Sequence, residues 1–458
     1  HSFPTRRSSD LGNNWFDNFT QKSVYCVEDN SVNSVGIENS AADKMSPANL
    51  WTTTIGDELK LATNFKSKVI GLSIKDRGAI LPAGHSADGA FWYDSKTGNF
   101  ISSTYYAKQL PSWVTNYNNQ HRVDSLYSKG WNLSLAKELY EANCDDDENN
   151  YESTPLGNDA KHFPYNLQSF IGKDYSKIAS TPHGNTIVSE VAMQALLNEK
   201  LGTDSITDLL AVSFSSPDYI GHSFGPNSWE TLDGYIKLDE TLANLFSFLD
   251  KQVGKNNYTV FLTADHAVAN IPAYAKKHKL PGENYDDASV KKDINTILTA
   301  NGLNNKLINA VSEYNIYFNH SLMDSLNISN DKLTNIISNG LEKNAKVLQV
   351  IESRKAAYAP IPANLRERIV NGYNAQRSGD LMLFTKSGIV DGYPTGTSHG
   401  VLYNYDAHIP LLFFGKGIKS GAVKTATFMT DIAPTISTLL GIQMPSGAIG
   451  QPIIEVLK

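Results

Sequence analysis

Short apolar runs rich in β-branched residues alternate along this chain with longer stretches in which apolar residues recur at helical spacing. The runs that predict strands lie at 68–74, 209–214, 258–263, 381–384 and 411–414. The stretches that predict helices lie at 46–64, 183–197, 226–249 and 431–441. Because alternating strands and helices favour a sheet covered on both faces, we predict an α/β fold: a three-layer α/β/α sandwich with a largely parallel central sheet plus cap insertions.

Two long segments interrupt this alternation. They predict cap-like insertions at about 76–180 and about 270–378, within a single catalytic domain that spans 12–458. The segment 143–158, inside the first insertion, is acidic and rich in turn-forming residues. Such a segment is typical of a surface loop, and a calcium site there is conceivable although the EF-hand pattern is absent.

Residues 1–11, HSFPTRRSSDL, lack the apolar core of a signal peptide. They match one reading frame of a common sequencing-library adapter. We therefore expect a non-native leader joined to a truncated gene, and we leave it out of the fold prediction. A native tail is the alternative.

Polar side chains suited to chemistry follow the predicted strands. Asp218 and His222 come after one strand, and we expect them in a strand-to-helix loop. Adjacent Asp265 and His266 end another strand, and His399 lies in a later turn-rich segment. Loops at the carboxyl ends of the strands form the crevice where ligands bind in an α/β sheet, so these side chains are candidates for one site.

Two carboxylates and three imidazoles from three loops make a plausible metal site, most naturally for zinc. Taken singly, an Asp at a strand end is often a helix cap, and a lone His is often structural. The five residues together are much less easily explained in that way.

Two cations follow the predicted strand at 68–74, namely Lys75 and Arg77. If the strand continues, residues i and i+2 point to the same face, and both cations could converge on one anion. A solvated charge cluster is the alternative.

Composition narrows the function classes. The chain of 458 residues is 41% hydrophobic and 19% charged, as in an ordinary globular protein. Its formal net charge of −7 argues against nucleic acid as the main partner, and no apolar run is long enough to cross a bilayer. Cys26 and Cys144 are the only cysteines, so there is no disulfide framework, and whether these two pair is open.

The order Asp218-x-x-x-His222, Asp265-His266, a long insertion, then His399 resembles the alkaline phosphatase superfamily of two-zinc enzymes. The likeness is greatest to the PafA-type bacterial alkaline phosphatases, which share the fold of nucleotide pyrophosphatases/phosphodiesterases. It covers Gly12 to Lys458. The further motifs that carry it are Gly12-Asn-Asn-Trp15, Lys75-Asp-Arg77, Thr263-Ala-Asp-His266 and Tyr405-Asp-Ala-His-Ile-Pro-Leu-Leu412.

The resemblance implies a site in which Asp218, His222 and His399 hold one zinc ion, while Asp265 and His266 contribute to a second. It implies that Asn13 hydrogen-bonds a phosphoryl oxygen and that Lys75 and Arg77 favour phosphate monoesters. By the same resemblance the substrates are small-molecule phosphate monoesters, hydrolysed through a covalent phosphoenzyme. A periplasmic or secreted monomer is expected.

The nucleophile and the Asp that completes the second zinc site belong, by the same resemblance, upstream of Asn13. We therefore expect no nucleophile within this chain, and we expect the chain alone to be inactive. Thr5, Ser8 and Ser9 are not substitutes, because they lie in the suspect leader.

Other functions remain open. A phosphodiesterase or nucleotide pyrophosphatase is the main alternative, and Lys75 and Arg77 argue against it. A sulfatase and a cofactor-independent phosphoglycerate mutase fit the ligand set less well. A non-enzymatic alternative is a binding module in which zinc only staples loops, although structural zinc sites usually close with four protein ligands, commonly including Cys.

Overall fold

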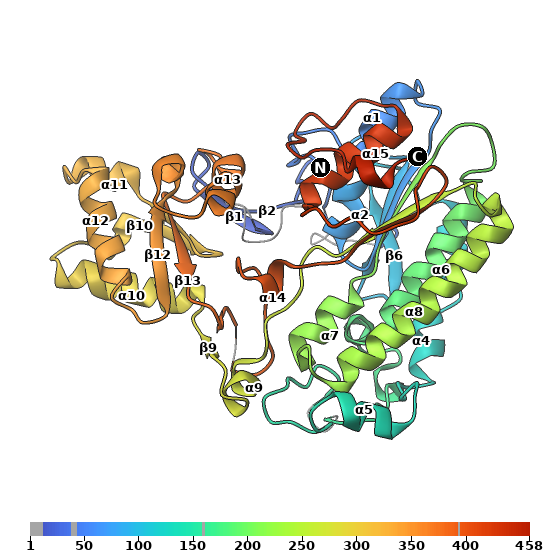
Figure 1. Cartoon of the computed structure of the whole chain (residues 1–458), viewed down its shortest axis with the longest axis horizontal. Coiled ribbons are helices and arrows are strands. Elements are labelled where there is room, and N and C mark those ends of the chain that lie inside the picture. Colours follow the sequence, from blue (N-terminus) through green and yellow to red (C-terminus); the bar gives the residue numbers. More distant parts are fainter. Residues whose placement is uncertain (1–11, 38–43, 158–160, 393) are drawn as a thin grey trace. The chain divides into compact units, whose positions relative to one another are not determined.

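The computed structural model describes residues 12–37, 44–157, 161–392 and 394–458, so the leader predicted at 1–11, with Thr5, Ser8 and Ser9, lies outside the described residues. The chain divides into two compact units (Figure 1). Unit 1 holds Val27–Thr263 and Pro410–Lys458, and unit 2 holds Ala264–Ile409 together with the segment that ends at Cys26. Cys26 and Cys144 do not form a disulfide with each other.

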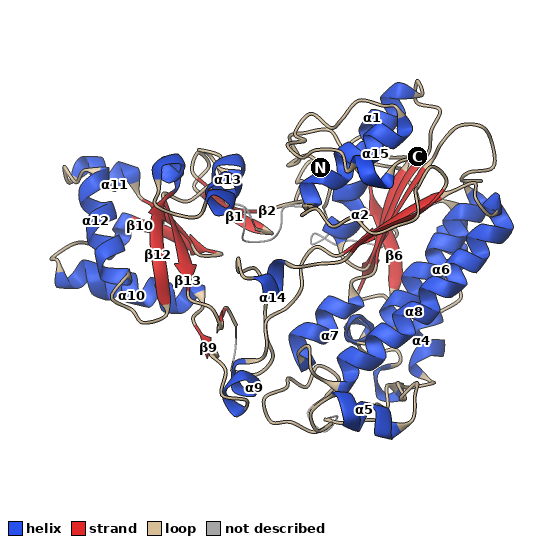
Figure 2. Ribbon diagram, in the orientation of Figure 1, coloured by secondary structure: helices blue, strands red, loops and turns tan. Residues whose placement is uncertain are grey.

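Unit 1 is built on a mixed sheet (Figure 2). The strands of unit 1 are β3 (Ser34–Val35), β4 (Val69–Ser73), β5 (Gly89–Asp94), β6 (Asn99–Ser103), β7 (Leu209–Ser213), β8 (Thr259–Thr263) and β15 (Leu411–Gly415). Five strands follow the order β3-β6-β5-β4-β7, in which β4 is parallel to β5 and β7 while β6 is antiparallel to β3 and β5. The strands β8 and β15 form an antiparallel pair.

Unit 1 also contains helices. They are α1 (Ile55–Ala62), α2 (Asp76–Ala83), α3 (Ser112–Asn118), α4 (Arg122–Tyr127), α5 (Lys137–Asn143), α6 (His183–Asn198), α7 (Ser216–Phe224), α8 (Trp229–Leu249) and α15 (Ile432–Leu440). In Figure 1 the long helices α6 and α8 run side by side.

Strand β4 shows how the layers form. Ile70 and Leu72 are buried in the core that also contains Val188 of α6. Successive strand residues point to opposite faces, so Gly71 faces the other way. A Cβ atom at Gly71 would lie 2.0 Å from the carbonyl oxygen of Ala79, and only glycine lets α2 approach the strand so closely. Helices therefore pack on both faces of β4, and the predicted α/β sandwich is confirmed.

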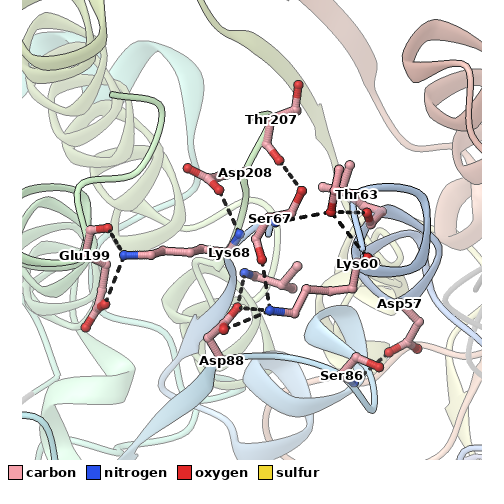
Figure 3. Close-up of polar contacts among 12 residues, drawn as sticks. Asp57, Lys60, Thr63, Ser67, Lys68, Ser86, Asp88, Glu199, Thr207 and Asp208 are labelled. Atoms are coloured by element: carbon pink, nitrogen blue, oxygen red, sulfur yellow. Dashed lines mark hydrogen bonds and ion pairs between the residues drawn. The ribbon is translucent and has the colours of Figure 1, made fainter. Parts of the chain in front are cut away.

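An ion pair between buried Lys60 and partly exposed Asp88 lies at the start of the central strands (Figure 3). The Lys60 ammonium donates to both carboxylate oxygens of Asp88 at 2.8 Å and to the Ser67 carbonyl at 2.9 Å. Asp88 also accepts a hydrogen bond from the Val69 backbone N–H at 2.7 Å. These contacts join α1 to the first residues of β4 and β5.

One prediction about local structure is wrong, and the condition attached to another is not met. The helix predicted from residue 46 begins only at Ile55, because Thr54 and Asp57 form a reciprocal capping box that sets the helix start. The strand before Lys75 does not continue through Arg77. It ends at Ser73, and Lys75 is the N-cap of α2, so the two cations do not alternate along a strand.

Unit 2 is built on a four-stranded sheet with the order β10-β11-β13-β12, in which every pairing is antiparallel. The strands of unit 2 are β1 (Asn14–Asp17), β2 (Lys22–Tyr25), β9 (Glu283–Asn284), β10 (Ile308–Ser312), β11 (Asn315–Phe318), β12 (Val347–Glu352), β13 (Leu381–Thr385) and β14 (Ile389–Val390). Its helices are α9 (Pro272–Lys277), α10 (Asp287–Ala300), α11 (His320–Ser325), α12 (Asn330–Leu341), α13 (Ala363–Gly372) and α14 (Asn404–Ala407). Ile294 of α10 and Leu333 of α12 are buried in the core with Leu383 of β13.

Among the described residues, no helix has the length and apolar character required to cross a membrane.

Candidate functional site

Asp218 and His222 lie on helix α7, directly after β7, and not in a loop as predicted. The helix starts early because Pro217 stands in its first turn, where the fixed φ of proline favours the helical conformation. The spacing of four residues places both side chains on one helix face. The His222 Nε2 atom lies 3.4 Å from the Asp218 Oδ1 atom. A carboxylate and an imidazole arranged in this way can share one cation.

Lys75 contacts Asp218 of this pair. Its ammonium forms an ion pair with Asp218 Oδ2 and lies 4.8 Å from the ring centroid of Tyr219. The Lys75 and Asp218 side chains are only 9% and 14% exposed. A cation thus already neutralises Asp218, as expected for a carboxylate that has lost most of its contact with water.

Serine hydroxyls at the ends of β4 and β7 position both partners. Ser73 Oγ accepts a hydrogen bond from the Lys75 backbone N–H at 3.0 Å and lies 3.2 Å from Ser215 Oγ. Ser215 is the N-cap of α7, and its Oγ lies 3.4 Å from Ser213 Oγ. These serines were not predicted as part of the site, and Ser215 makes no side-chain capping hydrogen bond to α7.

Arg77 lies two residues further along, in the first turn of α2. Its backbone N–H donates to Asp76 Oδ1 at 2.6 Å. Lys75 and Arg77 therefore flank Asp76 at the start of one helix, near the carboxyl end of β4.

Unit 2 carries a second group of possible metal ligands. One ligand atom each from His266, His399 and Asp406 lies within 4.8 Å of the others. The two imidazole rings are stacked with centroids 3.3 Å apart, and His399 is 8% exposed. Two imidazolium cations at this distance would repel strongly, so at least one ring is neutral, which is the form that binds metals.

The hydrogen bond of His266 assigns its tautomer. Its Nδ1 lies 2.8 Å from the Ala267 carbonyl oxygen, which only accepts, so Nδ1 carries the proton. In the neutral ring the lone pair is then on Nε2, as in a metal ligand whose other nitrogen is held by a carbonyl. This Nε2 lies 3.4 Å from Asp265 Oδ2, so the adjacent pair presents a nitrogen and an oxygen together.

Asp406 was not predicted. Its Oδ2 atom accepts hydrogen bonds from the backbone N–H groups of Gly400 at 2.5 Å and Val401 at 2.7 Å, and the residue is 1% exposed. It thereby holds the loop that carries His399. The motif around Tyr405 contained this signal, but only tertiary contacts reveal the partners.

Asn13 lies directly before β1 in unit 2, where its backbone N–H donates to Glu313 Oε1 at 3.1 Å. The eight predicted site residues thus fall into two sets. Unit 1 contains Lys75, Arg77, Asp218 and His222, whereas unit 2 contains Asn13, Asp265, His266 and His399.

Neutral imidazoles combined with carboxylates are the donor set that zinc prefers, and open sites of this kind belong to metal-dependent hydrolases. The residues present therefore fit a zinc-type ion. The chain belongs to the type I phosphodiesterase/nucleotide pyrophosphatase family, whose model matches residues 11–401.

Two relatives and one solved structure sharpen the comparison. The chain is 43% identical over 451 residues to alkaline phosphatase PafA of Elizabethkingia meningoseptica, covering 97% of this chain and 82% of that protein. It is 42% identical over 448 residues to alkaline phosphatase PhoV of Synechococcus elongatus, covering 98% of this chain and 80% of that protein. The crystal structure of wild-type PafA matches with a TM-score of 0.95 at 42% identity, over 100% of this chain and 89% of that one. The predicted resemblance is confirmed.

Proposed function

We propose that this protein hydrolyses phosphate monoesters with the help of two zinc ions. Asp218, His222 and His399 would hold one ion, and Asp265 and His266 would contribute to the other. The observation that carries the proposal is the set of paired imidazoles and carboxylates in a chain 43% identical to an alkaline phosphatase. Bound metal ions would activate the attacking oxygen and neutralise charge on the phosphoryl group.

The chain's own cations would bind the substrate. Lys75 and Arg77, at the start of α2, would donate to the non-bridging phosphoryl oxygens, together with Asn13. A phosphate monoester carries one more negative charge than a diester, so these donors favour monoesters electrostatically. Since the ammonium of Lys75 pairs with Asp218, it would turn from that carboxylate to the substrate when a metal ion binds.

Phosphodiester hydrolysis is the second candidate, because the matching family model is that of phosphodiesterases and nucleotide pyrophosphatases. Comparing p-nitrophenyl phosphate with bis(p-nitrophenyl) phosphate decides between the two. In the chain extended by its upstream coding sequence, we expect Lys75→Met and Arg77→Met to reduce monoester hydrolysis far more than diester hydrolysis. Lys66→Met is the matched control, since Lys66 is an exposed lysine of the same unit. Equal losses on both substrates would contradict the assigned role of the cations.

The expected upstream position of the nucleophile stays a prediction. It is tested by assaying this chain beside one that also carries its upstream coding sequence, each with measured zinc content. We expect turnover and two zinc ions in the extended chain only. Because a missing nucleophile does not prevent binding, zinc-dependent binding of inorganic phosphate to this chain, weakened by Lys75→Met, is a further test. Turnover by this chain would place the nucleophile within it.

The periplasmic or secreted location and the monomeric state also stay predictions. Light scattering coupled to size-exclusion chromatography measures the second.

A further inference from the structure

Unit 1 contains a group of acidic side chains that the proposed active site does not use. They come from the loop between α5 and residue 153, and from the start of α8. Asp145, Asp147 and Asn149 are half-buried, whereas the intervening Asp146 and Glu148 are exposed. Every second residue of this loop therefore turns inward.

Glu230, in the first turn of α8, is the last member of the group. Its residue exposure is 0%, and its Oε1 atom accepts a hydrogen bond from the Tyr165 hydroxyl. Among the described residues, no hydrogen-bond partner is found for its Oε2 atom or for the Oδ1 atom of Asp147, and both atoms are buried. Two buried carboxylate oxygens without donors are strongly unfavourable, and they are the atoms that a bound cation would satisfy.

The buried carboxylates interact electrostatically. Burial raises the pKa of Glu230 to about 8, and Asp147 adds to this shift. Burial also raises the pKa of Glu152 to about 9, and Glu230 and Asp147 add to it. In the described part of the chain, no lysine or arginine forms an ion pair with these three residues. The charges of His162 and Lys137 lower the pKa of Asp147 from a greater distance, although burial raises it overall.

We propose that Asp145, Asp147, Asn149, Glu152 and Glu230 bind one Ca²⁺ ion. The donors are all oxygens, and carboxylate and amide oxygens suit hard cations better than zinc. Within the described residues, these carboxylates do not reach the mutual spacing of 4.8 Å that joins His266, His399 and Asp406. Binding would therefore draw the loop inward, and Ca²⁺, which accepts six to eight ligands in flexible geometry, tolerates this better than Mg²⁺.

The loop is already tied to the helices that carry the candidate active site. The Ser153 backbone N–H donates to the Ser223 carbonyl of α7 at 2.8 Å. The Trp229 indole N–H donates to the Asp145 carbonyl at 2.8 Å. A cation between the loop and Glu230 would fix the junction of α7 and α8, and with it the helix that presents Asp218 and His222.

Thermal unfolding of the full chain tests the proposal, with zinc held constant and CaCl₂ or MgCl₂ added. We expect millimolar Ca²⁺ to raise the melting temperature by roughly 3 °C or more, and Mg²⁺ to do less. Tb³⁺ is a second probe, because its luminescence is excited through a nearby indole such as Trp229, and Ca²⁺ should displace it. Absence of a Ca²⁺-dependent shift in the unsubstituted chain would overturn the proposal.

Variants locate the effect. Glu230→Gln should abolish the Ca²⁺-dependent shift, because it replaces the buried carboxylate ligand with an amide of the same shape. Glu152→Gln should also weaken the shift. Asp146→Asn and Glu148→Gln are matched controls from the exposed side of the same loop, and they should keep it. A shift that persists in Glu230→Gln, or that is lost equally in the controls, would show that the ion binds elsewhere.

Discussion

The contact between Lys75 and Asp218 sets up a competition that can be measured. Both side chains are largely buried, at 9% and 14% exposure, and the ammonium occupies one carboxylate oxygen of a residue that we assign to a metal ion. A cation that binds Asp218 must displace Lys75. Replacing Lys75 with methionine keeps the length of the side chain and removes the competitor, so we expect tighter zinc binding.

The size of the effect follows from the ion pair. Breaking a buried pair on one side is unfavourable by ~3–5 kcal/mol. Asp218 keeps slight exposure and has His222 at 3.4 Å, so we take about 2 kcal/mol. This corresponds to roughly 30-fold tighter zinc binding in Lys75→Met, since about 1.4 kcal/mol is a factor of ten. The metal-free variant should also melt roughly 4–8 °C lower, because Asp218 is left without its ammonium.

Competition with a chromophoric zinc chelator at constant pH measures the affinity, and thermal unfolding measures the stability. Lys68→Met is the matched control, because Lys68 pairs with Glu199 at 3.7 Å in a more exposed setting, at 41% and 30% side-chain exposure. That control should leave zinc affinity unchanged. Unchanged or weaker zinc binding by Lys75→Met would refute the reasoning and would mean that Lys75 does not compete for Asp218.

Three further predictions concern stability. Lys60→Met should lower the free energy of unfolding by about 1.5 kcal/mol in a urea titration, since it removes the hydrogen bonds of a buried ammonium to Asp88, which is itself 40% exposed; a loss below about 0.5 kcal/mol, typical of surface sites, would argue against it. Thr54→Ala should lower it by about 1 kcal/mol through loss of the α1 capping box, and no change would mean that the cap is dispensable. The hydrogen bond to Asp380 raises the pKa of His320, so this contact stabilises the fold below the ordinary His pKa and is lost as pH rises through the raised value. His320→Gln should therefore reduce stability at pH 5.5 but little at pH 9, and an equal effect at both values would contradict the assignment.

Most strands and the long helices followed from local pattern. The runs at 209–214 and 411–414 match β7 at Leu209–Ser213 and β15 at Leu411–Gly415. The stretch at 226–249 matches α8 at Trp229–Leu249. Periodicity and β-branched content act within a few residues, so they are readable without knowing which neighbours will pack against them.

Element ends were less predictable. The start of α1 depends on the capping box of Thr54, and α7 begins at Ser216 although the segment looked like a loop. In both places a few side-chain hydrogen bonds or a single proline decide, and hydrophobic periodicity does not report them.

The candidate site was also only partly predictable from the sequence. The sequence by itself determined which residue types stand at the strand ends, and their spacing was enough to predict Asp218, His222, Asp265, His266 and His399 as candidate ligands. Their roles as ligands remain a proposal, whereas the family that they indicated is shown by the comparisons.

Only the tertiary structure decided which side chains meet. It paired Lys75 with Asp218 because β4 and β7 are neighbours in the sheet, and it brought Asp406 to His399 through backbone hydrogen bonds. It also turned Glu230 toward the acidic loop 145–152. The physical reason is that ion pairs, buried carboxylates and their pKa values depend on distance and burial between residues far apart in the chain, which local sequence pattern does not encode.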